Sequence, residues 1–215
     1  MSSLLVVAAG GLAREALAVV ALTGQYDEVR VLDDDRRLWG SSVSGHPVVG
    51  GLDLVPEFDD HEVLVCAGSG AARRALVERL TLAGVPEPRW ATLIHPSASV
   101  AAGCSVGAGS IVLAGVVMTA DVQVGRHVVL MPQVTLTHDD RVEDFATLCA
   151  GVTVGGGVRV GSGAYLGMSA SVRNGVRVGR DAVLGMGAAL VRDLPDEQTW
   201  VGVPARPAPE RQEAQ

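Results

Sequence analysis

Residues 154–172 read VGGGVRVGSGAYLGMSASV, and in this stretch an aliphatic residue returns at every sixth position. The same register runs without an insertion from Ile94 to Leu190. The residue four places after each aliphatic one is almost always small or Val, and Asp140 is the one charged exception. A period of six fits neither an α-helix nor a plain strand. It predicts a triangular solenoid in which each hexapeptide forms one short strand and one corner.

Three hexapeptides make one coil of 18 residues, so residues 94–195 supply between five and six coils. The interior of such a prism is too narrow for aromatic rings. This accounts for an unusual composition, in which 48% of the 215 residues are hydrophobic but only 3% are aromatic, beside 27 glycines. The core must therefore be built mostly from Val, Leu and Ala.

The residues before the repeat alternate short apolar runs with helical stretches. Strands are predicted at 4–9, 29–32, 63–67 and 90–94, and helices from the glycines at 10–11 to about Thr23 and over 71–83. Alternation of this kind is typical of a small parallel sheet. We therefore expect a Rossmann-like half-domain over residues 1–93 and the solenoid, with a C-terminal tail, over residues 94–215.

The first predicted strand is followed by a glycine turn, which partly matches a dinucleotide fingerprint. Gly10 and Gly11 lie where a helix begins, and Asp33 follows about 20 residues later, where that motif places a ribose-binding acid. Glycines at such a turn let phosphate oxygens approach the bare amides of a helix N-terminus. The same residues suit equally well a structural turn with a solvated acidic cap on the second strand.

Composition excludes several classes of function. The chain has no lysine, which rules out Schiff-base lysines and phosphate-loop lysines. A net charge of −7 with few aromatic residues argues against nucleic-acid binding, and no apolar run approaches the length of a membrane helix. The cysteines Cys66, Cys104 and Cys149 lie far apart, as suits buried thiols rather than disulfides or a metal site. We expect a cytoplasmic protein without a metal.

Among the histidines, His138 stands out because Asp139 and Asp140 follow it directly. One coil is 18 residues, so Gly156, inside a run of three glycines, should lie directly above His138. A base beside bare N–H donors is what acyl transfer from a thioester requires.

Asp140 falls in the inward column, and it either bonds Thr135, Thr137 or His138 or turns outward. The other histidines are expected to have no catalytic role. We expect His46 and His61 in surface loops, His95 at the structural Ile-His-Pro junction, and His127 at a solvated corner.

Four segments occur in an order that resembles a known family: AAGGLAREAL (8–17), VLDDDRRLWGSSVSGHPVVG (31–50), LIHPSASV (93–100) and VGVPAR (201–206). Together they resemble the bacterial sugar O- and N-acetyltransferases of the sialic-acid O-acetyltransferase family. The nucleotide-amino-sugar N-acetyltransferases of glycan biosynthesis are the most similar branch. The resemblance implies a left-handed parallel β-helix, although the general crossover rule would give the opposite hand. It also implies a homotrimer with acetyl-CoA lying between neighbouring β-helices, and an N-terminal domain that holds the nucleotide-sugar.

The resemblance also implies a role for individual residues. His138 is expected to be the general base and Asp139 the acid that raises its basicity. Gly10, Gly11 and Leu12 would form the phosphate loop. Asp33 and Asp34 would lie at the base and ribose site, and Gly68 would contact the sugar nucleotide. The acetyl-CoA contacts would come from Thr147, Gly156, Met168, Gly185 and Met186. Two positions depart from the family pattern, because a polar residue is common where this chain has Leu12 and a histidine where it has Thr147.

The resulting hypothesis is acetyl transfer from acetyl-CoA to the amino group of a nucleotide-linked amino sugar. Transfer to a sugar hydroxyl would use the same base, and the residues do not separate these two reactions. A catalytically decayed trimer that only binds nucleotide-sugar is the alternative from another class. The pair His138 and Asp139 argues against decay, whereas Leu12 and Thr147 argue for it.

Overall fold

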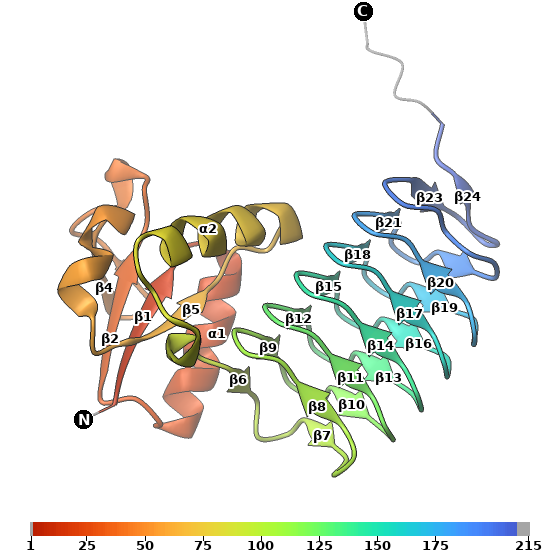
Figure 1. The fold of residues 1–215 in the computed structure, drawn as a ribbon, viewed down its shortest axis with the longest axis horizontal. Coiled ribbons are helices and arrows are strands. Elements are labelled where there is room, and N and C mark those ends of the chain that lie inside the picture. Colours follow the sequence, from red (N-terminus) through yellow and green to blue (C-terminus); the bar gives the residue numbers. More distant parts are fainter. Residues whose placement is uncertain (1, 210–215) are drawn as a thin grey trace, which may run out of the picture.

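The short apolar runs at the start of the chain form one sheet in the computed structural model, which describes residues 2–209 (Figure 1). The central strand β1 (Ser3–Val7) is buried along its whole length, as expected of a parallel strand covered on both faces. It pairs in parallel with β2 (Glu28–Leu32) and β5 (Glu62–Val65). The strand order is β3-β4-β2-β1-β5, in which β3 (Ser42–Val43) is antiparallel to β4 (His46–Gly50). The predicted parallel sheet is thus present, with an unpredicted hairpin at its edge.

Two helices follow β1 and β5 close to where they were predicted, α1 (Gly11–Thr23) and α2 (Gly70–Leu82). Helix α1 ends at Gly24, whose φ of 61° is the left-handed conformation that closes many helices. Three short 3-10 helices complete the domain, at Arg36–Leu38, Leu52–Phe58 and Glu87–Arg89. The last of them shortens the strand predicted over 90–94, so that only β6 (Leu93–Ile94) remains. No described helix is both long enough and apolar enough to cross a membrane.

From β6 to β22 the chain is a left-handed parallel β-helix of two-residue strands, each ending at a position of the six-residue series. Its three faces are named here in the order in which the chain meets them. Face 1 contains β6, β9 (Ile111–Val112), β12 (Val129–Leu130), β15 (Thr147–Leu148), β18 (Tyr165–Leu166), β21 (Val183–Leu184), β23 (Thr199–Val201) and the antiparallel β24 (Arg206–Pro207). Face 2 contains β7 (Ser99–Val100), β10 (Val117–Met118), β13 (Thr135–Leu136), β16 (Thr153–Val154), β19 (Ser171–Val172) and β22 (Ala189–Leu190). Face 3 contains β8 (Ser105–Val106), β11 (Gln123–Val124), β14 (Arg141–Val142), β17 (Arg159–Val160) and β20 (Arg177–Val178).

The corners of the solenoid have a backbone period of their own. Every sixth residue from Gly109 to Gly187 has a positive φ, and about half of these residues carry a side chain. This left-handed conformation reverses the chain in a short space. The corners are named by the faces they join, so that corner 2–3 lies between faces 2 and 3.

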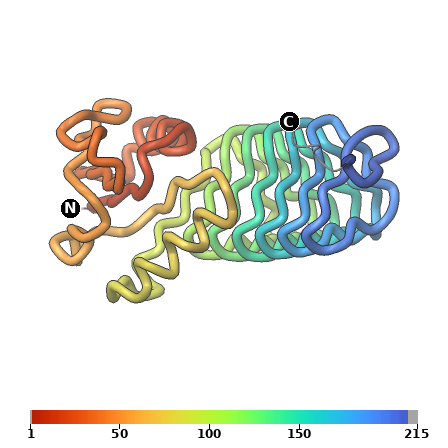
Figure 2. The backbone as a smooth tube through the Cα atoms, turned by 90° about the horizontal axis from the view of Figure 1, so that it is seen from above, coloured from red at the N-terminus to blue at the C-terminus, as the bar shows by residue number. Residues whose placement is uncertain are grey.

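The interior of the prism is aliphatic. Its buried cluster from Val112 to Leu190 consists of Val, Leu, Ala and Met118, and Trp200 closes the C-terminal end. This confirms the expectation that the core is built mostly from Val, Leu and Ala. Figure 2 shows the regular stack of coils, with the α/β domain beside its N-terminal end.

The α/β domain packs on the outside of the first coils. Ile111 and Val129 on the outer surface of face 1 belong to the same buried cluster as residues of β1, β2 and α1. At corner 3–1, helix α2 comes so close that a Cβ on Gly70 would lie 2.4 Å from the carbonyl oxygen of Phe145. The two parts therefore share one continuous core.

Arg73 of α2 is fully buried in this contact. Within residues 2–209 its guanidinium donates only to uncharged oxygens, which belong to three regions: the loop after β5, corner 3–1 and the start of β15. The acceptors are the carbonyls of Ala67 at 2.6 Å, Gly68 at 3.3 Å, His127 at 2.6 Å, Phe145 at 2.9 Å and Ala146 at 3.0 Å, and the Thr147 hydroxyl at 3.1 Å. Burial lowers the pKa of Arg73 to about 10, so the side chain remains charged at neutral pH.

His127 lies beside this guanidinium and is buried, so the prediction of a solvated corner is wrong. Its imidazole stacks on Phe145 with ring centroids 5.3 Å apart and meets Trp90 edge-on at 4.9 Å. Neither ring nitrogen has a hydrogen-bond partner among the described residues. Burial, with the nearby charges of Arg126 and Arg73, lowers the pKa of His127 to about 4. His61, also predicted at the surface, is buried against Phe58.

The first prediction concerns Arg73. Arg73→Met should lower the free energy of unfolding by roughly 3–5 kcal/mol, because several buried oxygens lose their donor. Arg74→Met is the matched control on the same helix. It removes a half-exposed pair with Asp181 at 3.1 Å and should cost less than about 1 kcal/mol. Chemical unfolding of both variants tests this, and equal losses would contradict the assigned role of Arg73.

The second prediction concerns acid stability. The pKa of His127 is about 4 in the folded protein against 6.5 for a free imidazole, so the unfolded chain binds a proton first as pH falls. The fold should lose up to roughly 3 kcal/mol between pH 6.5 and pH 4 from this residue. His127→Phe should reduce that loss, and Phe145 shows that this corner accepts a phenyl ring at positive φ. Melting temperatures at pH 7.5 and 5 check this, and an undiminished acid shift in the variant would refute it.

Candidate active site

His138 and Asp139 lie at corner 2–3, between β13 and β14, where both side chains are 68% exposed. Asp139 occupies the positive-φ position with φ 64°, a conformation that Asp tolerates better than most residues. Its carboxylate oxygen Oδ2 lies 2.8 Å from His138 Nδ1. A carboxylate only accepts hydrogen bonds, so Nδ1 carries the proton and Nε2 presents a free lone pair. The adjacent pair thus forms an oriented base.

Gly156 occupies the same corner one coil further along. A Cβ on Gly156 would lie 2.3 Å from His138 Nε2, so the imidazole covers the bare Cα of this glycine. The predicted stacking of the two residues is therefore present. The backbone N–H groups of Gly155 and Gly157 donate to Val172 and His138, whereas the N–H of Gly156 has no acceptor in the described part of the chain. A basic nitrogen and a free amide donor meet at this point.

Asp140, the next residue, points into the prism and is only 1% exposed. Of the two orientations left open by the sequence, the inward one is realised. Its partners are backbone amides, Thr137 N at 2.8 Å and Val158 N at 2.9 Å. Burial raises the pKa of Asp140 to about 6, against the opposing effect of these two hydrogen bonds.

The glycine turn before α1 leaves the first amides of the helix without a cap. Gly10 is the N-cap residue and has no side chain to accept from them. The first amides of a helix have no acceptor within it and attract anions. The Leu12 side chain, by contrast, is buried in the domain core, so only its backbone N–H can serve a phosphate.

The acidic residues after β2 already have partners. Both oxygens of Asp33 accept backbone amides, from Ala9 at 2.8 Å and from Asp35 at 2.8 Å. Asp34 accepts from Arg79 at 2.7 Å, and this contact holds the pKa of Asp34 below its usual value. Asp33 therefore ties the glycine turn to the end of β2, as the structural reading of this motif anticipated. The roles of Asp33 and Asp34 toward a ribose remain predictions.

Thr147 and Gly68 lie together, under the α/β domain and away from His138. The buried Thr147 hydroxyl donates to the Gly68 carbonyl at 3.1 Å and accepts from Arg73. Thr147 belongs to face 1, whereas His138 belongs to corner 2–3. The structure therefore groups Thr147 with the predicted sugar-nucleotide contact rather than with the base of the same chain.

Met168 and Met186 project from corner 1–2, where they are 52% and 73% exposed. Gly185 precedes Met186 and is packed so closely that a Cβ would lie 2.7 Å from Val201. This corner and the corner of His138 are separated by the whole of face 2. Within one chain these residues form no common site with the base.

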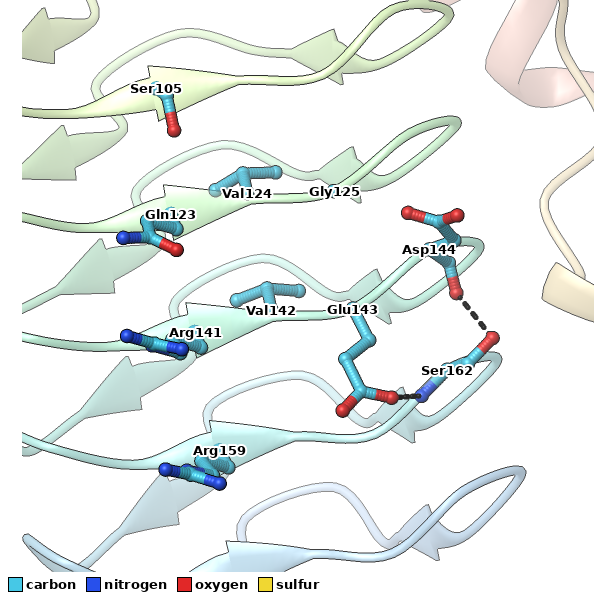
Figure 3. Close-up of a pocket in the computed structure, with 10 residues that line it drawn as sticks. All are labelled: Ser105, Gln123, Val124, Gly125, Arg141, Val142, Glu143, Asp144, Arg159 and Ser162. Carbon is cyan, nitrogen blue, oxygen red and sulfur yellow. Dashed lines mark hydrogen bonds between the residues drawn. The ribbon is translucent and has the colours of Figure 1, made fainter.

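An open groove of about 560 Å³ runs along face 3 (Figure 3). Arg141 and Arg159 lie side by side in register, and Arg177 follows in the next coil. The groove holds none of the predicted site residues; it is lined by Ser105, Gln123, Val124, Gly125, Arg141, Val142, Glu143, Asp144, Arg159 and Ser162. The signal for this groove in the sequence is the recurrence of Arg every 18 residues, at Arg141, Arg159 and Arg177. In the described residues no group of three His, Cys, Asp or Glu side chains could hold a metal ion.

Comparisons with known proteins agree with the fold described above. The profile of the PglD N-terminal domain matches residues 3–80. The acetyltransferase domain of PglB from Neisseria gonorrhoeae FA1090 is 31% identical, with 97% of this chain and 100% of that chain covered and a TM-score of 0.89. PerB from Caulobacter crescentus, solved with CoA and GDP-perosamine, is 30% identical over 97% of this chain and 98% of that chain, also with a TM-score of 0.89. A search of curated protein sequences gave no match.

Two further structures bear on the histidine. They show the perosamine N-acetyltransferase from Caulobacter crescentus with one histidine replaced by Asn or by Ala, each with CoA and GDP-perosamine. Both are 29% identical to this chain over 97% of its length, with TM-scores of 0.90 and 0.89. The PglB domain has likewise been solved with acetyl coenzyme A.

Proposed function

This chain belongs to the hexapeptide-repeat acetyltransferases of nucleotide-linked amino sugars, and we propose that His138 is its general base, with acetyl-CoA as the donor. The observation that carries the proposal is the corner at which Asp139 orients the imidazole over Gly156. His138 Nε2 lies against Gly156, whose backbone N–H has no acceptor among the described residues.

The reaction needs no covalent intermediate on the enzyme. The sugar amine attacks the thioester carbonyl of acetyl-CoA, and a C–N bond forms as the carbonyl oxygen becomes negative. The N–H of Gly156 donates to that oxygen, as an oxyanion donor does. His138 Nε2 accepts the proton of the amine, and Asp139 stabilises the imidazolium. Collapse of the intermediate breaks the C–S bond, and the imidazolium returns its proton to the departing CoA sulfur.

We assign the nucleotide-sugar to the α/β domain. The uncapped amides at the start of α1, around Gly10 and Gly11, suit the phosphate groups of a nucleotide. Gly68 lies at the loop after β5, on the same edge of the sheet as this turn, because β1 and β5 are parallel neighbours. Parallel strands place their following loops together, so both loops can reach one ligand.

The complete site is proposed to lie between subunits of a homotrimer. His138 lies at corner 2–3, whereas the methionines Met168 and Met186 lie at corner 1–2 of the same prism. This separation supports a CoA site to which two chains contribute. The two exposed methionines form an apolar ridge of the kind that marks an interface. Sedimentation equilibrium should give three times the chain mass of 22.1 kDa, and a monomer at working concentration would contradict the shared site.

We place the reaction in the cytoplasm, where acetyl-CoA is available to a soluble enzyme. All three cysteines are free thiols, in agreement with a reducing compartment. None of them has a role in the proposed chemistry.

The test is acetyl transfer by purified protein from acetyl-CoA to a panel of nucleotide-linked amino sugars. CoA release and the mass of the acetylated product are both measured. His138→Ala should keep the fold and lower kcat by about 10²–10⁴, because the proton acceptor is lost. Wild-type protein that transfers acetyl to no amino sugar, or a His138→Ala variant of full activity, would overturn the proposal.

Asp139→Asn provides a graded change, since it keeps the size of the side chain but removes the charge that orients the imidazole. Its matched control is Asp121→Asn, one coil earlier at the same corner and also at positive φ. We expect reduced kcat for the first variant and wild-type kcat for the second.

A further inference from the structure

Asp140 is the one charged residue in the inward column of the solenoid, and the proposed chemistry does not use it. Its neighbours in that column along the chain are Val134 and Ala146, both completely buried. A carboxylate at such a place loses its hydration and is costly unless hydrogen bonds replace it. The contacts that replace it show what the residue does.

The two oxygens of this carboxyl group join two successive coils. Oδ2 accepts the amide of Thr137, which immediately precedes His138, at 2.8 Å. Oδ1 accepts the amide of Val158 at 2.9 Å, 18 residues further on. Val158 follows the glycine run of corner 2–3 that contains Gly156. The Asp140 side chain thus binds the backbone amide just before His138 and a backbone amide two residues after Gly156.

We propose that Asp140 is a positioning residue that holds the His138 corner and the Gly156 corner in register for acetyl transfer. The inference rests on the proposed function. The relative placement of base and oxyanion donor depends on two neighbouring coils, and a bridge between their corners fixes it. A shift of about 1 Å between groups of this kind can cost about 10²-fold in rate.

Ser110 shows what the same bridge looks like where no chemistry takes place. It lies in the same inward column at corner 3–1 and is fully buried. Its hydroxyl accepts the amide of Val128, 18 residues on, at 2.9 Å and donates to the Gly125 carbonyl at 2.9 Å. A hydroxyl is therefore enough to join two coils. A carboxylate differs in offering two acceptors, and both Thr137 and Val158 present donors.

The charge state fits this role at neutral pH. The titratable groups that act on this carboxyl group are His138, which favours the anion when protonated, and Asp139, which disfavours it. Val158 contributes only its backbone from the next coil. With a pKa of about 6, Asp140 is largely anionic above that pH, so both oxygens accept. Protonation at lower pH turns one oxygen into a donor and removes one side of the bridge.

The experiment compares Asp140→Ser and Asp140→Asn with Ser110→Ala. Each Asp140 variant loses at least one of the two acceptors, so kcat should fall by about 10–100-fold while KM for both substrates stays within about twofold. Ser110→Ala breaks a bridge of the same span at the other corner and should keep wild-type kcat. Unchanged kcat in both folded Asp140 variants would overturn the proposal, as would an equal loss of kcat in Ser110→Ala.

Hydrogen–deuterium exchange gives a second readout that does not depend on activity. Peptides containing Thr137 and Val158 should exchange faster in the Asp140 variants, whereas a peptide containing Val128 should do so only in Ser110→Ala. This measurement separates the two proposals, because a chain that transfers no acetyl group can still show or lack the bridge. Unaltered exchange at the amides of Thr137 and Val158 in the Asp140 variants would refute the proposed bridge. If Asp140→Ser fails to fold, Asp140→Asn keeps the side-chain size and serves for both measurements.

Discussion

The buried guanidinium of Arg73 is the contact on which the arrangement of the two parts depends. It replaces its lost hydration with neutral oxygens from the loop after β5, from corner 3–1 and from β15. An isolated buried cation is costly, and many well-placed acceptors offset that cost. No acidic side chain of the described residues pairs with it, so the position of the cation depends on backbone carbonyls and on the Thr147 hydroxyl. Arg73 therefore joins the loop after β5 to the solenoid, in addition to the apolar contacts that the two parts share.

The corners of the solenoid can carry functional side chains more easily than its interior can. The inward positions follow the six-residue pattern closely, so their side chains are restricted to those that pack in the core. Corner residues project outward at fixed height and spacing, one coil apart. His138, Asp139 and Gly156 use that spacing, and Asp140 fixes it from inside. A regular scaffold thus supplies distances that a loop-based site would need many contacts to maintain.

Sequence periodicity predicted what depends on a single coil or on its repetition. It predicted the strands, their register and the stacking of Gly156 on His138. It failed where the two domains meet, as at His127, because the ring that covers an imidazole there comes from Trp90, far away in the sequence. It also left the orientation of the Asp140 side chain undecided, because one of the amides that bind it, that of Val158, belongs to the next coil. For the same reason the partners of Asp33 could not be read from the glycine motif.

The 18-residue coil also limits how such a chain can change its length. An insertion of one hexapeptide between β13 and β16 would turn everything beyond it by one face. Gly156 would then leave the corner of His138, although the new solenoid would be as well packed as the old. Only insertions or deletions of a whole coil keep the order of the faces. Even a whole coil inserted between β13 and β16 would separate the His138 imidazole from Gly156. Length variation compatible with the site is therefore confined to the coils before His138 or after Gly156, in steps of three strands.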